Sequence, residues 1–113
     1  MNTITERRIV ATLEYSSAYD ATPVTLEVHT DSYADGSLAI VAVEARTREP
    51  YGKLSVNVGE HTDLRTGEFY LKDWAMNEEL ADALVLTGSI VPVIDQPPFH
   101  SGFSTAFCYR ITE

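Results

Sequence analysis

The feature that most constrains the fold is a pair of strand-like segments joined by a polar loop. The first segment, residues 51–58, has an apolar side chain at every second position from Leu54 onward. The second segment, residues 67–73, repeats this period with Phe69 and Leu71. A period of two is typical of a strand with one buried face. The sequence therefore predicts a hairpin here, followed directly by a helix.

Three segments in the first half of the chain also predict strands. Residues 7–15 and 24–29 alternate between apolar and polar side chains, whereas residues 38–43 are almost continuously apolar. A short apolar run beside a turn is typical of a central strand covered on both faces, and a buried helix is the alternative. The β-branched residues of this run and its short length favour the strand.

One helix is predicted over residues 77–87. Asn77 is a suitable N-cap and Gly88 a suitable residue beyond the C-terminus. At 100° per residue, Leu80 and Leu84 fall on one side, which we expect to pack on the sheet. The other side carries the acids Glu78, Glu79 and Asp82.

The remaining residues complete a single domain that spans residues 1–113. Residues 90–94 are apolar but contain Pro92, so they are expected to form an extended edge segment, and residues 95–102 a loop. Residues 103–111 alternate most regularly of all. About six strands and one helix predict an α+β fold with a mainly antiparallel sheet. The expected core contains Leu54, Val56, Phe69, Leu80, Leu84, Phe107 and Tyr109.

Composition restricts the classes of partner. The chain has 17 Asp and Glu against 8 Lys and Arg, a net charge of −9. Such a surface repels phosphate backbones, so we expect no direct nucleic-acid binding and, if the partner is charged, a basic one. The single cysteine, the absence of a signal-peptide pattern and the absence of a membrane-span pattern predict a cytoplasmic protein without a membrane contact.

No pattern in the sequence predicts catalysis, a metal or a cofactor. His29, His61 and His100 lack the spacing of metal ligands, and Cys108 is expected to be a packed thiol. Glu78 and Asp82 lie four residues apart and could form an acid–base pair, but a solvated face is the simpler interpretation. We therefore expect a protein that is not an enzyme; an enzyme using Glu78, Asp82 or a histidine is an alternative hypothesis.

The placement of charge is the best functional lead. Residues 9–45 and 73–109 contain no Lys or Arg, yet each stretch carries several acids. Uncompensated acids produce a field of one sign, which accelerates encounter with a basic surface. The expected partner-binding residues are Glu78, Glu79, Asp82, Leu86, Asp31 and Asp35. The competing explanations are that the acids serve only solubility and that the apolar 90–94 segment covers Leu86.

Four features of the second half of the chain occur together. They are Tyr51-Gly52-x-Leu54-x-Val56-Asn57, Thr66-Gly67-Glu68 before an apolar strand, a helix headed by Asn77, and a strand that begins with Gly102-Phe103. On these features, residues 51–111 resemble a family of short, largely uncharacterised proteins of bacterial phages and mobile elements. The resemblance implies no catalytic residues. It implies a setting in which small acidic proteins inhibit host defence complexes, such as CRISPR effectors, by occupying nucleic-acid-binding surfaces.

Overall fold

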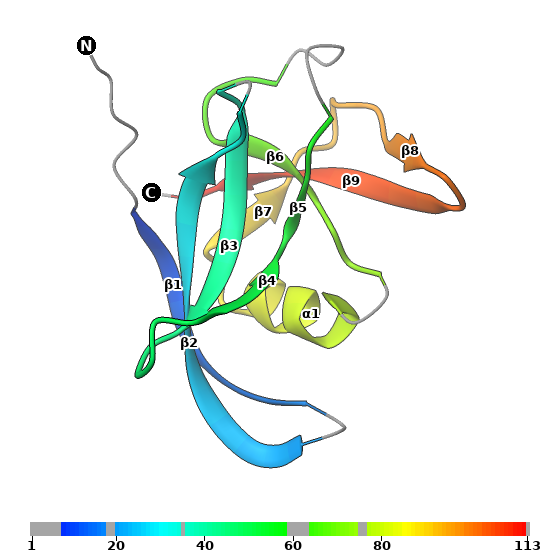
Figure 1. Ribbon diagram of the computed structural model, residues 1–113. Helices are drawn as coiled ribbons and strands as arrows, with labels where there is room; N and C mark the ends of the chain where they lie inside the picture. The colour runs from blue at the N-terminus through cyan, green and yellow to red at the C-terminus, as the bar shows by residue number, and fades with distance from the viewer. Residues whose placement is uncertain (1–7, 18–19, 35, 59–63, 75–76, 113) are drawn as a thin grey trace, which may run out of the picture.

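Nine strands and one helix make up the part of the chain that the structure describes (Figure 1). The structure is a computed structural model, and it describes residues 8–17, 20–34, 36–58, 64–74 and 77–112. In chain order the elements are β1 (Ile9–Ser17), β2 (Asp20–Ser32), β3 (Leu38–Glu44), β4 (Pro50–Lys53), β5 (Ser55–Val56), β6 (Glu68–Leu71), α1 (Glu78–Leu86), β7 (Ile90–Pro92), β8 (Phe99–Ser101) and β9 (Ser104–Ile111). All pairings between these strands are antiparallel. The predicted α+β class is confirmed.

The strands form two sheets rather than one. The first has the order β1-β2-β3-β4, and the second has the order β5-β6-β9-β7, with β8 paired to the start of β9. The inner position of β3 confirms the prediction of a central strand over residues 38–43. Ala39 and Val43 are buried on one face of this strand, and Ile40 and Ala42 are buried on the other.

Leu54 is the point at which the chain passes from one sheet to the other. Its backbone N–H donates to the carbonyl of Ile40 at 2.8 Å, and its carbonyl accepts from the N–H of Lys72 at 2.8 Å. The segment expected to be one hairpin strand is therefore divided: β4 pairs with β3, and only β5 pairs with β6. The periodicity was the same on both sides of the division, so it could not reveal the change of partner.

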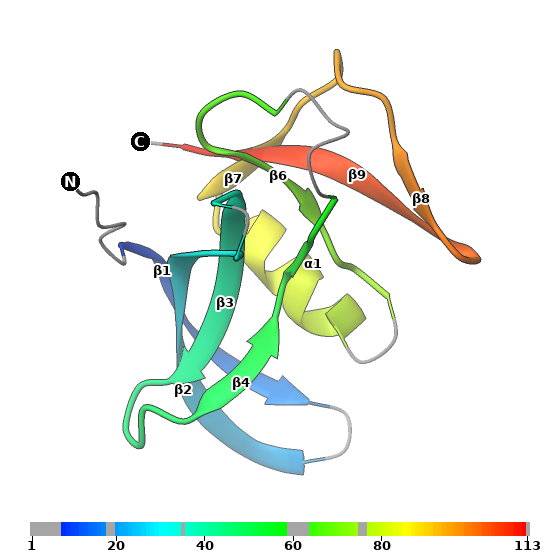
Figure 2. The same ribbon diagram turned by 45° about the horizontal axis from the view of Figure 1, so that its top comes forward.

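The inner cluster of apolar side chains lies between the two sheets and α1. The helix contacts β1 at the end of the first sheet and β7 at the end of the second, so it closes the open side of an incomplete barrel (Figure 2). Leu80 and Leu84 are buried as predicted, and each burial of this kind contributes about 1.5–3 kcal/mol. The buried members of the inner cluster are Tyr15, Leu26, Val28, Ile40, Ala42, Leu54, Phe69, Leu71, Leu80, Ala81, Leu84, Ile90 and Ile111.

A second group of apolar side chains, the outer cluster, covers the other face of the second sheet. Its buried members are Val58, Tyr70, Ala106 and Cys108. Because the inner and outer clusters cover opposite faces, every residue of β6 is buried. Val56 packs against the outer cluster and Tyr109 against the inner one, so these two expected core residues lie on opposite sides of the sheet.

Two predictions for the C-terminal region were wrong. Phe107 is 54% exposed. It lies between the part of β9 that pairs with β7 and the part that pairs with β8, so neither strand brings side chains beside it on that edge. The expected loop over residues 95–102 contains β8, which forms a hairpin with β9 through Gly102 at φ 61°. Figure 1 shows this hairpin projecting beyond the rest of the sheet.

The only helix among the described residues, α1, is nine residues long. No helix in the described ranges is both long and apolar enough to span a bilayer.

Candidate functional site

The exposed side of α1 carries three of the expected partner-binding acids in one continuous row with Leu86. Glu78, Asp82 and Leu86 are four residues apart, so they follow one another along the same helical face over about 12 Å. Glu79 adjoins the first of them. All three carboxylates are exposed, and Leu86 is 87% exposed. We call these four residues the acidic row.

The opposite side of α1 fixes the orientation of the row. Leu80, Ala81 and Leu84 are buried, whereas the predicted N-cap bond of Asn77 is absent. The Asn77 side chain instead donates through Nδ2 to the carbonyl of Lys53 at 2.6 Å and, at 3.4 Å, to that of Lys72. Asn77 therefore ties the start of the helix to the junction between the two sheets.

Within the part of the chain that the structure describes, no cation neutralises the acids of the row. Among the residues that the structure describes, Glu78, Glu79 and Asp82 form no ion pair. Other acids do: Arg48 donates to Glu27 at 2.6 Å, and Arg65 to Asp95 at 2.7 Å. Each of these contacts lowers the pKa of its carboxyl, chiefly through the hydrogen bond from the arginine. The negative potential of the row is thus left for solvent or a partner.

One acid of the row, Glu79, influences the pKa of a buried tyrosine. The pKa of Tyr15 is raised, first because its hydroxyl is partly desolvated and second because Glu79 and Tyr51 lie nearby. The rings of Tyr15 and Tyr51 meet edge to face with centroids 6.0 Å apart. The start of the row therefore adjoins a tyrosine pair whose outer member, Tyr51, is 45% exposed.

The other two expected partner-binding residues do not belong to α1. Asp31 lies at the end of β2, where its carboxylate accepts the N–H of Ser32 at 2.8 Å. Asp35 lies outside the described residues. The explanation that residues 90–94 cover Leu86 is wrong, because Leu86 remains exposed while Ile90 turns into the inner cluster.

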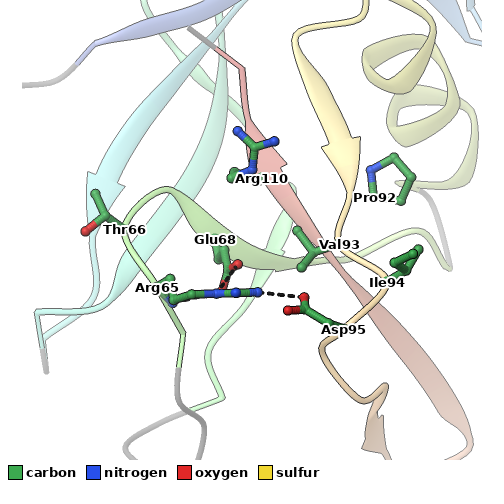
Figure 3. A pocket seen from close by; sticks show the side chains of 8 residues that line it. All are labelled: Arg65, Thr66, Glu68, Pro92, Val93, Ile94, Asp95 and Arg110. Atoms are coloured by element: carbon green, nitrogen blue, oxygen red, sulfur yellow. Dashed lines mark hydrogen bonds and ion pairs between the residues drawn. The ribbon is translucent and has the colours of Figure 1, made fainter.

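A pocket that sequence analysis missed lies at the outer face of the second sheet (Figure 3). Its volume is about 360 Å³. The polar side chains that line it are Arg65, Thr66, Glu68, Asp95 and Arg110, and the apolar ones are Pro92, Val93 and Ile94. These residues come from three separate parts of the chain. The one sequence feature that pointed to this pocket was Arg110, a charged residue within the regularly alternating segment 103–111.

Glu68 is the buried anchor of this pocket. The side chain is 2% exposed, and its carboxylate accepts hydrogen bonds from the backbone N–H of Arg65 at 2.8 Å, from Nε of Arg65 at 2.8 Å and from Gln96 at 2.9 Å. Burial opposes ionisation, but these hydrogen bonds and the arginine charge outweigh it, and the pKa of Glu68 is lowered. Glu68 therefore remains a charged group that holds Arg65 in place.

The residues considered for metal or nucleophilic chemistry are dispersed. His29 is buried, with Nε2 at 3.0 Å from Glu27, and His100 lies 3.1 Å from the hydroxyl of Thr105. His61 lies outside the described residues. Within the described ranges, no three His, Cys, Asp or Glu side chains are grouped as metal ligands. Burial, with a contribution from Glu68, raises the pKa of Cys108 to about 11, which keeps it a neutral thiol.

Comparison with known proteins yields no relative. No family model, curated protein or solved structure matches the chain.

Proposed function

We propose that this protein is a non-enzymatic inhibitor that binds a basic surface of a host protein through the acidic row. The carrying observation is that Leu86 lies exposed in line with carboxylates that have no ion-pair partner among the described residues. An exposed apolar anchor beside uncompensated charge is the arrangement that both steers a partner and retains it. The row would take the place of nucleic-acid phosphates in a basic groove.

The nature of the partner follows from charge and from the resemblance of residues 51–111 to proteins of phages and mobile elements. A chain with a net charge of −9 is attracted to surfaces that bind nucleic acid. In a phage setting, such surfaces belong to host defence complexes, including CRISPR effectors. The alternative function is an accessory interaction domain that inhibits nothing and whose acids serve only solubility.

The test compares two variants that remove the same charge. The first is Glu78→Gln/Glu79→Gln/Asp82→Asn in the row, and the control is Glu14→Gln/Glu44→Gln/Glu49→Gln elsewhere. Each is used with the parent protein to capture partners from a bacterial lysate, and the partner identified is then titrated in purified form. We expect the row variant to associate at least tenfold more slowly and the control to associate like the parent.

Three further measurements distinguish nucleic-acid mimicry from non-specific charge attraction. Parent binding should weaken as salt is raised, and competing DNA or guide RNA should displace the protein from its partner. Leu86→Ser should raise the dissociation rate with little effect on association, because its contact forms only after docking. Equal binding by the row variant and the parent, without salt dependence, would refute the mimicry and support the solubility explanation.

A further inference from the structure

The pocket on the second sheet contains a cation whose natural partner is occupied. Arg110 of β9 lies directly opposite Glu68 of β6 in the strand register. Oppositely charged residues in such positions ordinarily pair. Here, however, the Glu68 carboxylate is taken by Arg65 and Gln96. Among the described residues, Arg110 forms no ion pair.

The second carboxylate of the pocket, that of Asp95, is also paired with Arg65. Asp95 accepts from Nη2 of Arg65 at 2.7 Å, so Arg65 satisfies both acids at once. Figure 3 shows Arg65 joined to both carboxylates, with Arg110 apart from them on β9. The stem of Arg110 passes Gly67, where an added Cβ would lie 3.8 Å from its Cγ. Arg110 is exposed and lines the pocket, so its guanidinium donors are available to a ligand there.

We propose that this pocket binds a carboxylate that carries an apolar group, with Arg110 as the anion-binding residue. A guanidinium presents a planar pair of donors that matches a carboxylate in a bidentate geometry. Val93 and Ile94 contribute apolar surface to the lining of the pocket. The volume of about 360 Å³ accommodates a small ligand or one terminal residue of a peptide.

The same surroundings favour a monoanion over phosphate. The carboxylates of Glu68 and Asp95 line the pocket together with Arg110, and the chain as a whole is acidic. The formal charges of the two arginines and two carboxylates in the lining cancel, and the chain's net charge of −9 opposes a dianion more strongly than a single carboxylate. A free carboxylic acid and the C-terminus of a peptide share the required chemistry. This pocket is separate from the acidic row and does not depend on the function proposed for it.

The experiment is an amide NMR titration of the full chain with four probes. They are hexanoate, a short peptide ending in leucine with a free carboxylate, the same peptide as its C-terminal amide, and inorganic phosphate. We expect shifts centred on the pocket with at least one of the two apolar carboxylates and none with the amide. Binding of the peptide acid identifies a peptide terminus as a ligand source, and binding of hexanoate alone identifies a free acid.

Variants assign the interaction to Arg110. Arg110→Gln should raise the dissociation constant at least tenfold, and Arg110→Lys should restore only part of the affinity because it keeps the charge but loses the fork. Arg46→Gln, which removes an exposed charge in the β3–β4 connection, should bind like the parent. The spectra report in each case that the variant is folded. Absence of binding by both carboxylates, tighter binding of phosphate, or equal losses in the Arg110→Gln and Arg46→Gln variants would overturn the proposal.

Discussion

The backbone N–H of Leu54 donates to Ile40 in the first sheet, while its carbonyl accepts from the N–H of Lys72, the residue that follows β6 of the second sheet. The N–H of Leu54 donates to the Ile40 carbonyl at 2.8 Å, and the Leu54 side chain is fully buried in the inner cluster. One residue therefore serves as the backbone connection between the sheets and as part of the apolar interior. Mutations here should test the whole architecture rather than one strand.

Leu54→Ala should destabilise the protein by about 2–5 kcal/mol, because it removes a fully buried side chain and leaves a cavity between the sheets. The free energy of unfolding is measured by urea denaturation. Ile94→Ala is the matched control, since Ile94 is 96% exposed and its truncation should change stability by no more than about 0.5 kcal/mol. A small loss at both positions would contradict the packing described for Leu54.

Asn77→Asp should distinguish two roles for the residue that begins α1. An aspartate is an equally good N-cap, so a capping role predicts no loss. The amide of Asn77 instead donates to the carbonyl of Lys53, which a carboxylate cannot do and would repel. We expect both Asn77→Asp and Asn77→Ala to lower the free energy of unfolding, by about 0.5–1.5 kcal/mol for alanine. Full stability in the aspartate variant would contradict the observed donor role.

Glu68→Gln should reduce the loss of stability on acidification. The pKa of Glu68 is lowered below its usual value of 4.5, so its ionised form is favoured in the folded state. Its contribution is therefore complete above the unfolded value and disappears as the pH falls through the lower folded value. We expect the parent to be more stable than the variant at neutral pH, by about 1–3 kcal/mol, and the difference to narrow below about pH 4.

The pH experiment follows urea midpoints of the parent and Glu68→Gln over the same series of buffers. Subtraction of the two curves removes the contributions of the other carboxyl groups. A constant difference between the curves across the acidic range would show that Glu68 stabilises the fold through packing rather than through its charge.

Cys108 should resist thiol reagents in the folded protein. Burial raises its pKa to about 11, so very little thiolate is present near neutral pH, and the side chain is 2% exposed. Absorbance after addition of an aromatic disulfide reagent at about pH 8 should rise only when denaturant is added. Rapid reaction of the native protein would show that the outer cluster opens readily around β9.

The sequence predicts elements well where burial and period agree. Residues 38–43 were identifiable because a short apolar run rich in β-branched residues favours a covered strand over a buried helix, and Leu80 and Leu84 because a helix must bury one side. The alternation of apolar and polar residues indicates which face of a strand a residue occupies. It does not indicate whether other side chains cover that face. For that reason Phe107 was expected in the core and is exposed.

The two candidate sites differ in how far the sequence alone could predict them. The acidic row is local, since its members follow one another at helical spacing, so α1 and its exposed face could be predicted together. The pocket joins Arg65, Asp95 and Arg110, which no local pattern relates. The division at Leu54 was hidden for the same reason, because a change of strand partner leaves the sequence period unchanged.

The closure of the barrel by α1 also has a dynamic consequence. A helix of nine residues has little stability on its own, and α1 contributes no hydrogen bonds to either sheet ladder. We therefore expect α1 to open more readily than the strand ladders, so amide exchange within residues 78–86 should be faster than within β3 or β9. A partner seated on the acidic row would bind only protein in which α1 is folded. Its first effect would be slower amide exchange in α1. Binding at the exposed face of the helix would therefore be detected as protection of the amides of Leu80 and Leu84, whose side chains are buried in the inner cluster.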